Sequence, residues 1–261
     1  MKEQIIKGLR AVADLILPRT CAVCGRKLLL DERHLCLPCL AELPLTYFWE
    51  RDHNVMADRF NHLIEKELES RPADGRLERY AYAAALFFYD GQGDYRHIQH
   101  RLKYQGDIRI GQYFGKMLGS RLAGAAHFAD IDMVIPVPLH WTRQWKRGYN
   151  QAEVIAREIA RELGTSTRTD ILQRHRRTRT QTRIDPKAKS ANVSGAFIAK
   201  PGPVTRTKFI PGCPPEHLHI LLVDDVFTSG STLMACFTAL RSVFPPSVRI
   251  SITTLAFVGG V

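Results

Sequence analysis

Short apolar runs alternate with longer amphipathic segments along most of the chain, most clearly in its second half. Runs typical of buried strands lie at residues 80–89, 133–137, 171–172, 220–223 and 248–255. Apolar positions at helical spacing predict helices at residues 95–104, 108–122, 151–163 and 231–243, and residues 50–79 are expected to form a helix and a connection. Strands that alternate with helices form mostly parallel sheets covered on both faces, so the pattern predicts an α/β fold. Ligands of such sheets bind at the carboxyl ends of the strands.

The N-terminal residues carry a separate amphipathic pattern. Apolar side chains repeat at helical spacing over residues 3–17, and Pro18 ends the pattern. Such a helix packs against the protein or lies on a membrane surface, and we expect packing. No apolar run approaches the about 20 residues that span a bilayer. Arg10 and Asp14 interrupt the stretch that a signal peptide would need, so we expect a cytoplasmic protein without a membrane span.

Four of the six cysteines form a C-x2-C-x11-C-x2-C pattern near the N-terminus, and they are Cys21, Cys24, Cys36 and Cys39. Two thiolates two residues apart can hold one tetrahedral ion, and two such pairs complete a zinc site with four cysteine ligands. Because four protein ligands leave no open position, a structural zinc ribbon is expected. His34 is a weaker alternative ligand, whereas Cys213 and Cys236 are expected in the core or in a loop.

Residues 220–232 combine a buried strand, two carboxylates, a loop of small hydroxyl residues and the start of a helix. Gly230 permits a close approach of the backbone to a phosphate, which the N–H groups at a helix start attract. The carboxylates suit ribose hydroxyls and, at one remove, Mg²⁺. The residues expected to contact the ligand are Asp224, Asp225, Val226, Phe227, Thr228, Ser229, Gly230, Ser231 and Thr232. An ordinary capped turn explains one hydroxyl but not this combination.

Two expectations about substitutions follow from this segment. Adjacent carboxylates repel each other, so removing the charge of Asp224 and Asp225 is expected to cost little stability. A side chain at Gly230 is expected to fill the space of the phosphate and to demand an unfavourable backbone angle.

Basic residues gather in two further segments of a chain whose formal net charge is +11. Residues 136–151 follow a predicted strand, and the basic loop within them offers Arg143, Lys146, Arg147 and Gly148 to a pyrophosphate. The second segment contains Arg168, Arg174, Arg176, Arg177, Arg179, Arg183, Lys187 and Lys189. Such a run is typical of a solvated loop, and opposite a pyrophosphate it would serve as a lid. A basic chain favours polyanions, although a solvated basic surface is equally compatible with the charge.

Residues 220–232 resemble the fingerprint with which type I phosphoribosyltransferases bind 5-phosphoribosyl pyrophosphate (PRPP). Together with the cysteine ribbon, the motifs resemble the ComF family, named for a protein of bacterial DNA uptake. They are Leu102-Lys103-Tyr104, Pro136 to His140, Arg147 to Ala152, Arg174 to Gln181, Asn192 to Phe197 and Val223 to Thr232. The chain departs from the family at Ser229, where many members have Thr, and at Lys189, where Arg is expected.

The resemblance implies a type I phosphoribosyltransferase-like sheet flanked by helices, residues 50–261, behind the helix and zinc ribbon of residues 1–49. It also implies a role in natural transformation. The first hypothesis is a Mg²⁺-dependent phosphoribosyltransferase in which Asp224 and Asp225 orient the ribose during catalysis and the acceptor is unknown. The second is a non-catalytic accessory of the competence machinery that binds a nucleotide or single-stranded DNA. In that case Tyr47, Phe48 and Trp49 would stack on bases, unless they belong to the core.

Overall fold

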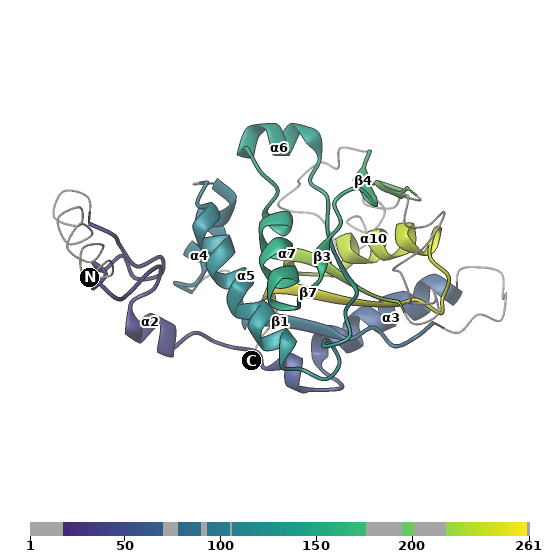
Figure 1. The fold of residues 1–261 in the computed structure, drawn as a ribbon, viewed down its shortest axis with the longest axis horizontal. Helices are drawn as coiled ribbons and strands as arrows, with labels where there is room; N and C mark the ends of the chain where they lie inside the picture. Colours follow the sequence, from purple (N-terminus) through teal and green to yellow (C-terminus); the bar gives the residue numbers. More distant parts are fainter. Residues whose placement is uncertain are drawn as a thin grey trace.

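The computed structural model describes residues 18–69, 78–89, 93–104, 106–175, 195–200 and 218–259 (Figure 1). The predicted helix at residues 3–17 lies outside these residues. So do Cys213 and the part of the basic run from Arg176 to Lys189.

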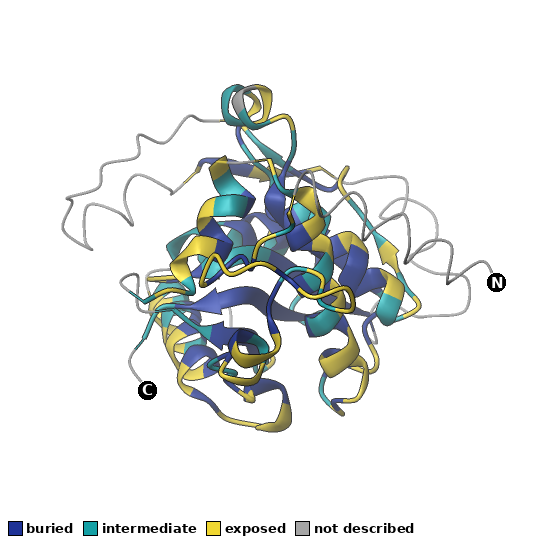
Figure 2. Ribbon diagram, turned by 90° about the vertical axis from the view of Figure 1, so that its left-hand side faces the viewer, coloured by how far each residue is buried: buried dark blue, intermediate teal, exposed yellow. Residues whose placement is uncertain are grey.

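A five-stranded sheet forms the centre of the molecule, with the strand order β1-β7-β6-β2-β3. Its strands are β1 (Ala83–Phe88), β2 (Met133–Pro136), β3 (Ser166–Thr167), β6 (His219–Phe227) and β7 (Arg249–Phe257). All the pairs are parallel, which confirms the predicted α/β class. Each strand but the short β3 is mainly buried, as the apolar runs require, and Figure 2 shows this layer in dark blue.

Helices cover both faces of the sheet. They are α3 (Val55–Glu69), α4 (Arg96–Tyr104), α5 (Ile108–Ala123), α7 (Gln151–Glu162) and α10 (Ser231–Arg241). Helices α5 and α7 pack against each other, whereas α3 and α10 make a second layer (Figure 1). Their outer surfaces are exposed and their inner surfaces are buried (Figure 2), which is the pattern that the helical spacing predicted.

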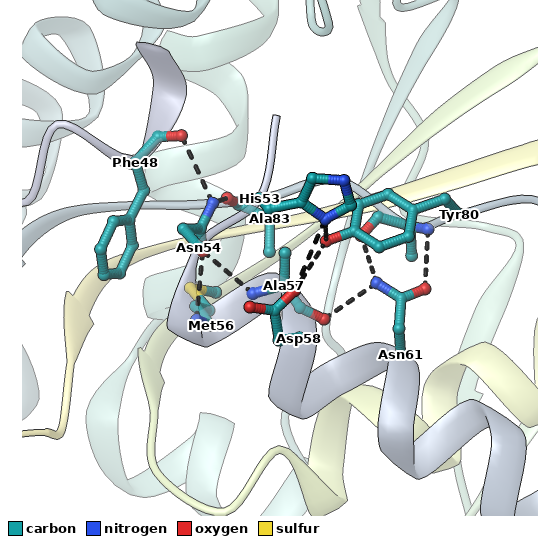
Figure 3. A network of polar contacts seen from close by, with 10 residues as sticks. Phe48, His53, Asn54, Met56, Ala57, Asp58, Asn61, Tyr80 and Ala83 are labelled. Atoms are coloured by element: carbon teal, nitrogen blue, oxygen red, sulfur yellow. Dashed lines mark hydrogen bonds and ion pairs between the residues drawn. The ribbon is translucent and has the colours of Figure 1, made fainter. Parts of the chain in front are cut away.

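Helix α3 is fixed to strand β1 by two asparagine side chains (Figure 3). Asn54 accepts a hydrogen bond from the backbone N–H of Ala57 at 3.0 Å and donates to the carbonyl oxygen of Ala83 at 2.9 Å. Asn61, further along the helix, both donates to and accepts from the backbone of Ala81, at 2.9 and 3.0 Å. Asn54 therefore satisfies N–H groups at the helix start, and both side chains tie α3 to β1 and to the residues that lead into it.

Smaller elements flank this core. Helix α2 (Leu37–Ala41) belongs to the segment that contains the four cysteines, which we call the cysteine module. The 3-10 helix η1 (Phe48–Glu50) follows it. Strands β4 (Leu172–Arg174) and β5 (Phe197–Ala199) form an antiparallel pair that packs against α10. Helix α6 (Trp141–Arg147) stands out from the body of the molecule in Figure 1. None of the described helices is long and apolar enough to cross a membrane.

Candidate functional site

A cavity of about 430 Å³ opens at the carboxyl ends of β2 and β6. Strand β2 lies between β6 and β3. The chain passes from β2 to β3 on one side and later forms β6 on the other side. This reversal of strand order is where parallel sheets bind their ligands. Seven of the residues predicted to bind the ligand line this cavity: Arg143, Arg147, Asp224, Asp225, Val226, Thr228 and Thr232. Two segments that are far apart in the sequence therefore meet at one place.

Other predicted residues do not line the cavity. Phe227 is buried and stacks on Phe257, with 5.7 Å between the ring centroids. The hydroxyls of Ser229 and Ser231 lie 2.9 Å apart and are exposed. Among the remaining candidates, Gly148 ends α6, and the Lys146 side chain lies outside the described part of the chain.

Strand β6 continues beyond the predicted end at Val223, because β7 pairs with it as far as Phe227. Strand β2 pairs with β6 only up to Val223, so the side of β6 that faces β2 is open from Asp224 onward. The two carboxylates thus lie within a strand, beside the cavity, and the hydroxyl loop begins only at Thr228.

The two carboxylates have different surroundings. Asp225 forms an ion pair with Lys103 of α4, at 2.9 Å. Burial raises the pKa of Asp224 to about 8, and the negative charge of Asp225 adds to the effect. Burial by itself lowers the pKa of Lys103, but its contact with Asp225 raises it above the ordinary value. At neutral pH the pair therefore carries one negative charge, which Lys103 balances.

Lys103 is the residue that the sequence interpretation missed. It belongs to the Leu102-Lys103-Tyr104 motif, which contributed to the family resemblance but to which the sequence assigned no function. Its position on a helix far before β6 in the sequence gives no sign that it reaches Asp225. The structure also places Gln99 of α4 here, where its side-chain amide donates to the carbonyl oxygen of Asp225 at 3.3 Å.

The basic side of the cavity comes from α6 and β4. The predicted loop is in fact a short helix, α6, which His140 caps by accepting from the N–H of Thr142, and which Gly148 ends with a φ of 78°. Arg147 donates to the side-chain oxygen of Gln151 at 3.0 Å. Arg174 also lines the cavity, and burial and the nearby charge of Arg143 lower its pKa. Several guanidinium groups around one space are the arrangement that suits a polyanion.

Gly230 has the predicted positive φ, 76°, at the start of α10. Its role differs from the prediction in one respect. A Cβ atom at this position would lie 2.9 Å from Leu63 and 2.9 Å from Phe227, both side chains of the core. The glycine therefore lets the loop approach the core closely, and a larger side chain there would disturb the fold before it met a ligand.

The four cysteines of the ribbon form a cluster whose Sγ atoms all lie within 4.8 Å of one another. The Sγ atoms of Cys24 and Cys36 are 3.6 Å apart, close to the about 3.8 Å expected around tetrahedral zinc. Burial alone would raise the pKa of Cys36, but hydrogen bonds from Cys39 and Arg26 outweigh it and lower the pKa to about 6. The cluster can therefore bind a metal such as zinc.

His34, the alternative ligand, does not belong to the cysteine cluster. Its ring lies against Tyr113 of α5, with 5.1 Å between the centroids. The side chain thus holds the cysteine module to the helix layer.

The remaining aromatic and cysteine predictions concern the core. Phe48 and Trp49 are each only 3% exposed, so they are core residues and do not stack on bases. Tyr47 is partly exposed, and Cys236 is buried in α10, as predicted.

No family model matches the chain. Curated relatives do. Competence protein F of Haemophilus influenzae is 29% identical over 153 residues, which are 58% of this chain and 63% of that protein. DNA utilization protein YhgH of Salmonella typhi is 28% identical over 139 residues, 52% of this chain and 56% of that protein. YhgH of Escherichia coli O157:H7 is 27% identical over 218 residues, 82% of this chain and 80% of that protein.

For the first two of these relatives, the match thus spans less than two thirds of their length. The longer match to the third extends the likeness over most of the present chain. These names agree with the resemblance that the motifs indicated. The chain is therefore a homologue of the ComF family proteins named competence protein F and YhgH.

Proposed function

We propose that the chain binds PRPP together with Mg²⁺ in the cavity at the carboxyl ends of β2 and β6. One observation carries this proposal: a single cavity is lined by two arginines of α6, one of β4, the paired carboxylates and the hydroxyls of Thr228 and Thr232. PRPP needs these groups, because it joins a phosphate, a ribose and a pyrophosphate in one molecule.

The electrostatic balance of the cavity favours such a ligand. Its lining contains four cationic side chains, Lys103, Arg143, Arg147 and Arg174. Lys103 balances Asp225, and Asp224 with a pKa of about 8 is mostly neutral at pH 7. The adjacent carboxylates therefore do not repel the phosphates as two full charges would, and the arginines dominate the field.

The groups divide by chemistry. Asp224 and Asp225 would accept hydrogen bonds from the ribose hydroxyls, and Thr228, Thr232 and the N-terminus of α10 would bind the 5-phosphate. Arg143 and Arg147 would hold the pyrophosphate, whose departure requires stabilised negative charge. Bound Mg²⁺ would supply further charge neutralisation at the pyrophosphate. We further propose that the phosphoribosyl group is transferred to an acceptor.

Titration calorimetry with PRPP and Mg²⁺ tests the binding. The variant that combines Arg143→Gln with Arg147→Gln should lose about a hundredfold or more in affinity, because each lost charged hydrogen bond costs about 1.5–3 kcal/mol. Arg157→Gln is the matched control, because Arg157 pairs with Glu153 on the outer side of α7 and does not line the cavity. A parent protein that does not bind PRPP, or a double variant that binds equally well, would refute the proposal.

The names of the relatives indicate the setting. One is named for competence and the others for DNA utilization, so we propose a role in DNA uptake for this chain, inside the cytoplasm. A PRPP-dependent step and the competence machinery would then be connected through this protein.

A second candidate function is binding of single-stranded nucleic acid. Trp141 and Trp145 lie one helical turn apart on α6 and are 70% and 86% exposed. Arg143 and Arg147 belong to the same short helix. Exposed aromatic rings beside basic side chains are the groups on which single-stranded bases stack.

Tryptophan fluorescence tests this second function directly. The chain has three tryptophans, and the third, Trp49, is buried, so oligo(dT) that stacks on α6 should quench the exposed pair. Binding should weaken steeply with salt. The Trp141→Ala, Trp145→Ala double variant should lose this binding but keep its affinity for PRPP. Binding that survives in the double variant would place the contact elsewhere.

A further inference from the structure

Two glutamines line the cavity of the proposed PRPP site, and both are only 3% exposed. Gln99 belongs to α4, and Gln151 is the first residue of α7. Each has one side-chain atom without a hydrogen-bond partner in the described part of the chain, the oxygen of Gln99 and the nitrogen of Gln151. A buried polar atom that lacks a partner costs free energy. Two such atoms at one cavity indicate contacts that a ligand completes.

The orientation of the Gln151 amide is fixed by Arg147. The guanidinium of Arg147 donates to the side-chain oxygen of Gln151 at 3.0 Å. Because a guanidinium has no acceptor, the amide cannot be reversed, and the nitrogen is the atom that remains without a partner. This N–H group needs an acceptor from the ligand. Arg143 and Arg147 line the same cavity, so the acceptor that fits their charge is an oxygen of an anion.

Gln99 presents the opposite polarity. Its amide nitrogen donates to the carbonyl oxygen of Asp225 at 3.3 Å. Reversal of this amide would set oxygen against oxygen, so the side-chain oxygen is the atom that remains without a partner. It needs a donor from the ligand. A fully ionised phosphate offers no donor, whereas a ribose hydroxyl does, and Asp225 is already assigned to the ribose in the proposed function.

We propose that the two glutamines determine the ligand specificity of the cavity, Gln151 by donating to the pyrophosphate and Gln99 by accepting from a ribose hydroxyl. The inference rests on the proposed function of this cavity and adds two residues to it. The required ligand has an anionic oxygen beside Arg147 and a hydroxyl beside Asp225. Inorganic pyrophosphate satisfies only Gln151, and ribose 5-phosphate satisfies only Gln99, so these two compounds test the glutamines separately.

Calorimetry on the full chain with Mg²⁺ gives the Kd for PRPP, and competition with PRPP gives the Kd for each of the two smaller compounds. Gln151→Met should weaken binding of PRPP and of pyrophosphate by about tenfold or more, because a hydrogen bond to a charged group is lost. Gln99→Met should weaken binding of PRPP and of ribose 5-phosphate by about fivefold. Each variant should bind the other small compound within about twofold of the parent, which also shows that the cavity is still folded.

Two further variants complete the design. Gln144→Met is the matched control, because Gln144 is an exposed glutamine of α6 that does not line the cavity, and it should bind all three compounds like the parent. Arg147→Gln separates direct donation from positioning. If Gln151 donates to the ligand, Gln151→Met should weaken PRPP binding further in the Arg147→Gln background. If it acts only by holding Arg147, this second loss disappears.

The outcomes distinguish the two proposals. If the parent does not bind PRPP, the proposed function fails, and the specificity inference fails with it. If the parent binds PRPP but a glutamine variant weakens both small compounds equally, or neither of them, that inference is wrong and PRPP binding stands. Loss of the effect of Gln151→Met in the Arg147→Gln background would equally overturn the assignment of Gln151 as a donor.

Discussion

Asp224 and Asp225 are neighbours in the sequence, but their carboxylates have different partners. Asp225 pairs with Lys103 at 2.9 Å, and its side chain is only 15% exposed. Asp224 has a pKa raised to about 8, mainly by burial. We therefore keep the expectation of a small stability cost for Asp224 alone, because removal of the Asp225 charge would leave a largely buried lysine without its partner.

The two single variants should separate in stability. We expect Asp225→Asn to lower the free energy of unfolding by about 2 kcal/mol, because Lys103 then remains buried and unpaired. Asp224→Asn should leave it nearly unchanged at pH 7, since the native carboxyl is already mostly protonated. Urea unfolding of both variants provides the measurement. If both variants lose the same free energy of unfolding, the ion pair of Asp225 with Lys103 contributes no more to stability than the Asp224 carboxyl does.

A buried histidine should make the fold sensitive to acid. His219 forms hydrogen bonds at both ring nitrogens, with Asp130 at 2.7 Å and with Ser251 at 2.8 Å. Burial lowers its pKa below the ordinary value, although Asp130 acts in the opposite direction. The unfolded chain therefore binds a proton at this histidine at higher pH than the folded chain does. Its contribution to stability is complete above the unfolded pKa of about 6.5 and declines as the pH falls below that value.

Unfolding free energies at pH 7.5 and 5.5 test this contribution. The loss per pH unit from one such proton approaches about 1.4 kcal/mol at most. His219→Gln removes the titrating group and should flatten the slope over this interval, even if it lowers stability at both pH values. An unchanged slope would assign the acid sensitivity to other titrating groups.

At the scale of elements, the close approach of α5 and α7 depends on glycines. Gly115 and Gly119 lie one turn apart on the buried side of α5. A Cβ atom at Gly119 would lie 2.9 Å from the Cα atom of Ile159, and one at Gly115 would lie 3.1 Å from the Cα atom of Ile155. These contacts are with backbone, which cannot rotate away. The two helices must therefore separate if either glycine gains a side chain.

Gly119→Ala should destabilise the protein despite the better helix propensity of alanine. Propensity favours alanine by about 1 kcal/mol, whereas forced separation of packed helices costs about 1–3 kcal/mol. Ser120→Ala, at the next and exposed position of the same helix, is the matched control and should be neutral or slightly stabilising. Thermal melts of both variants decide the matter. If the Gly119→Ala variant melts at a higher temperature than the parent, α5 and α7 can accommodate the methyl group and the packing argument is wrong.

Most elements of the sheet and its helices could be predicted from their periodicity, because buried strands and amphipathic helices leave local signals. The end of β6 could not, since its last residues include two carboxylates that are held in the strand by pairing with the distant β7. The pattern predicts a loop where α6 forms, because prolines and a glycine enclose a short segment with no apolar stripe. The lining residues that belong to recognisable motifs, such as Asp224 and Arg147, could be predicted from the sequence. Lys103 and Gln99 could not, because only the tertiary fold brings α4 to the cavity.

At the scale of the whole molecule, the contacts of residues 45–49 bear on the predicted boundary at residue 49 between the cysteine module and the main domain. Leu45 forms a bridge with Phe87 of β1, and the N–H of Thr46 donates to the carbonyl oxygen of Leu86 at 3.1 Å. Phe48 and Trp49 are buried in the same core as β1. We therefore propose that residues 43–49 fold with the sheet and that the zinc-dependent part ends near residue 42.

Removal of zinc should expose this boundary. We expect the backbone hydrogen bonds of the ribbon up to residue 42, such as the one from Ala22 to His34 at 2.8 Å, to depend on the four thiolates and their metal, because metal binding couples to folding in small ribbons of this kind. Cys36→Ser should release about one zinc ion per chain, and amide hydrogens in residues 18–42 should then exchange with solvent much faster than in the parent. Within residues 43–49, Thr46 should keep its protection, because its N–H donates to the carbonyl oxygen of Leu86 in β1, and Trp49 fluorescence should not change. Hydrogen exchange read by mass spectrometry, together with metal analysis, resolves the two segments. Purified protein that contains no zinc would contradict the metal assignment, whereas loss of protection through residue 49 would place the boundary where the sequence pattern first put it.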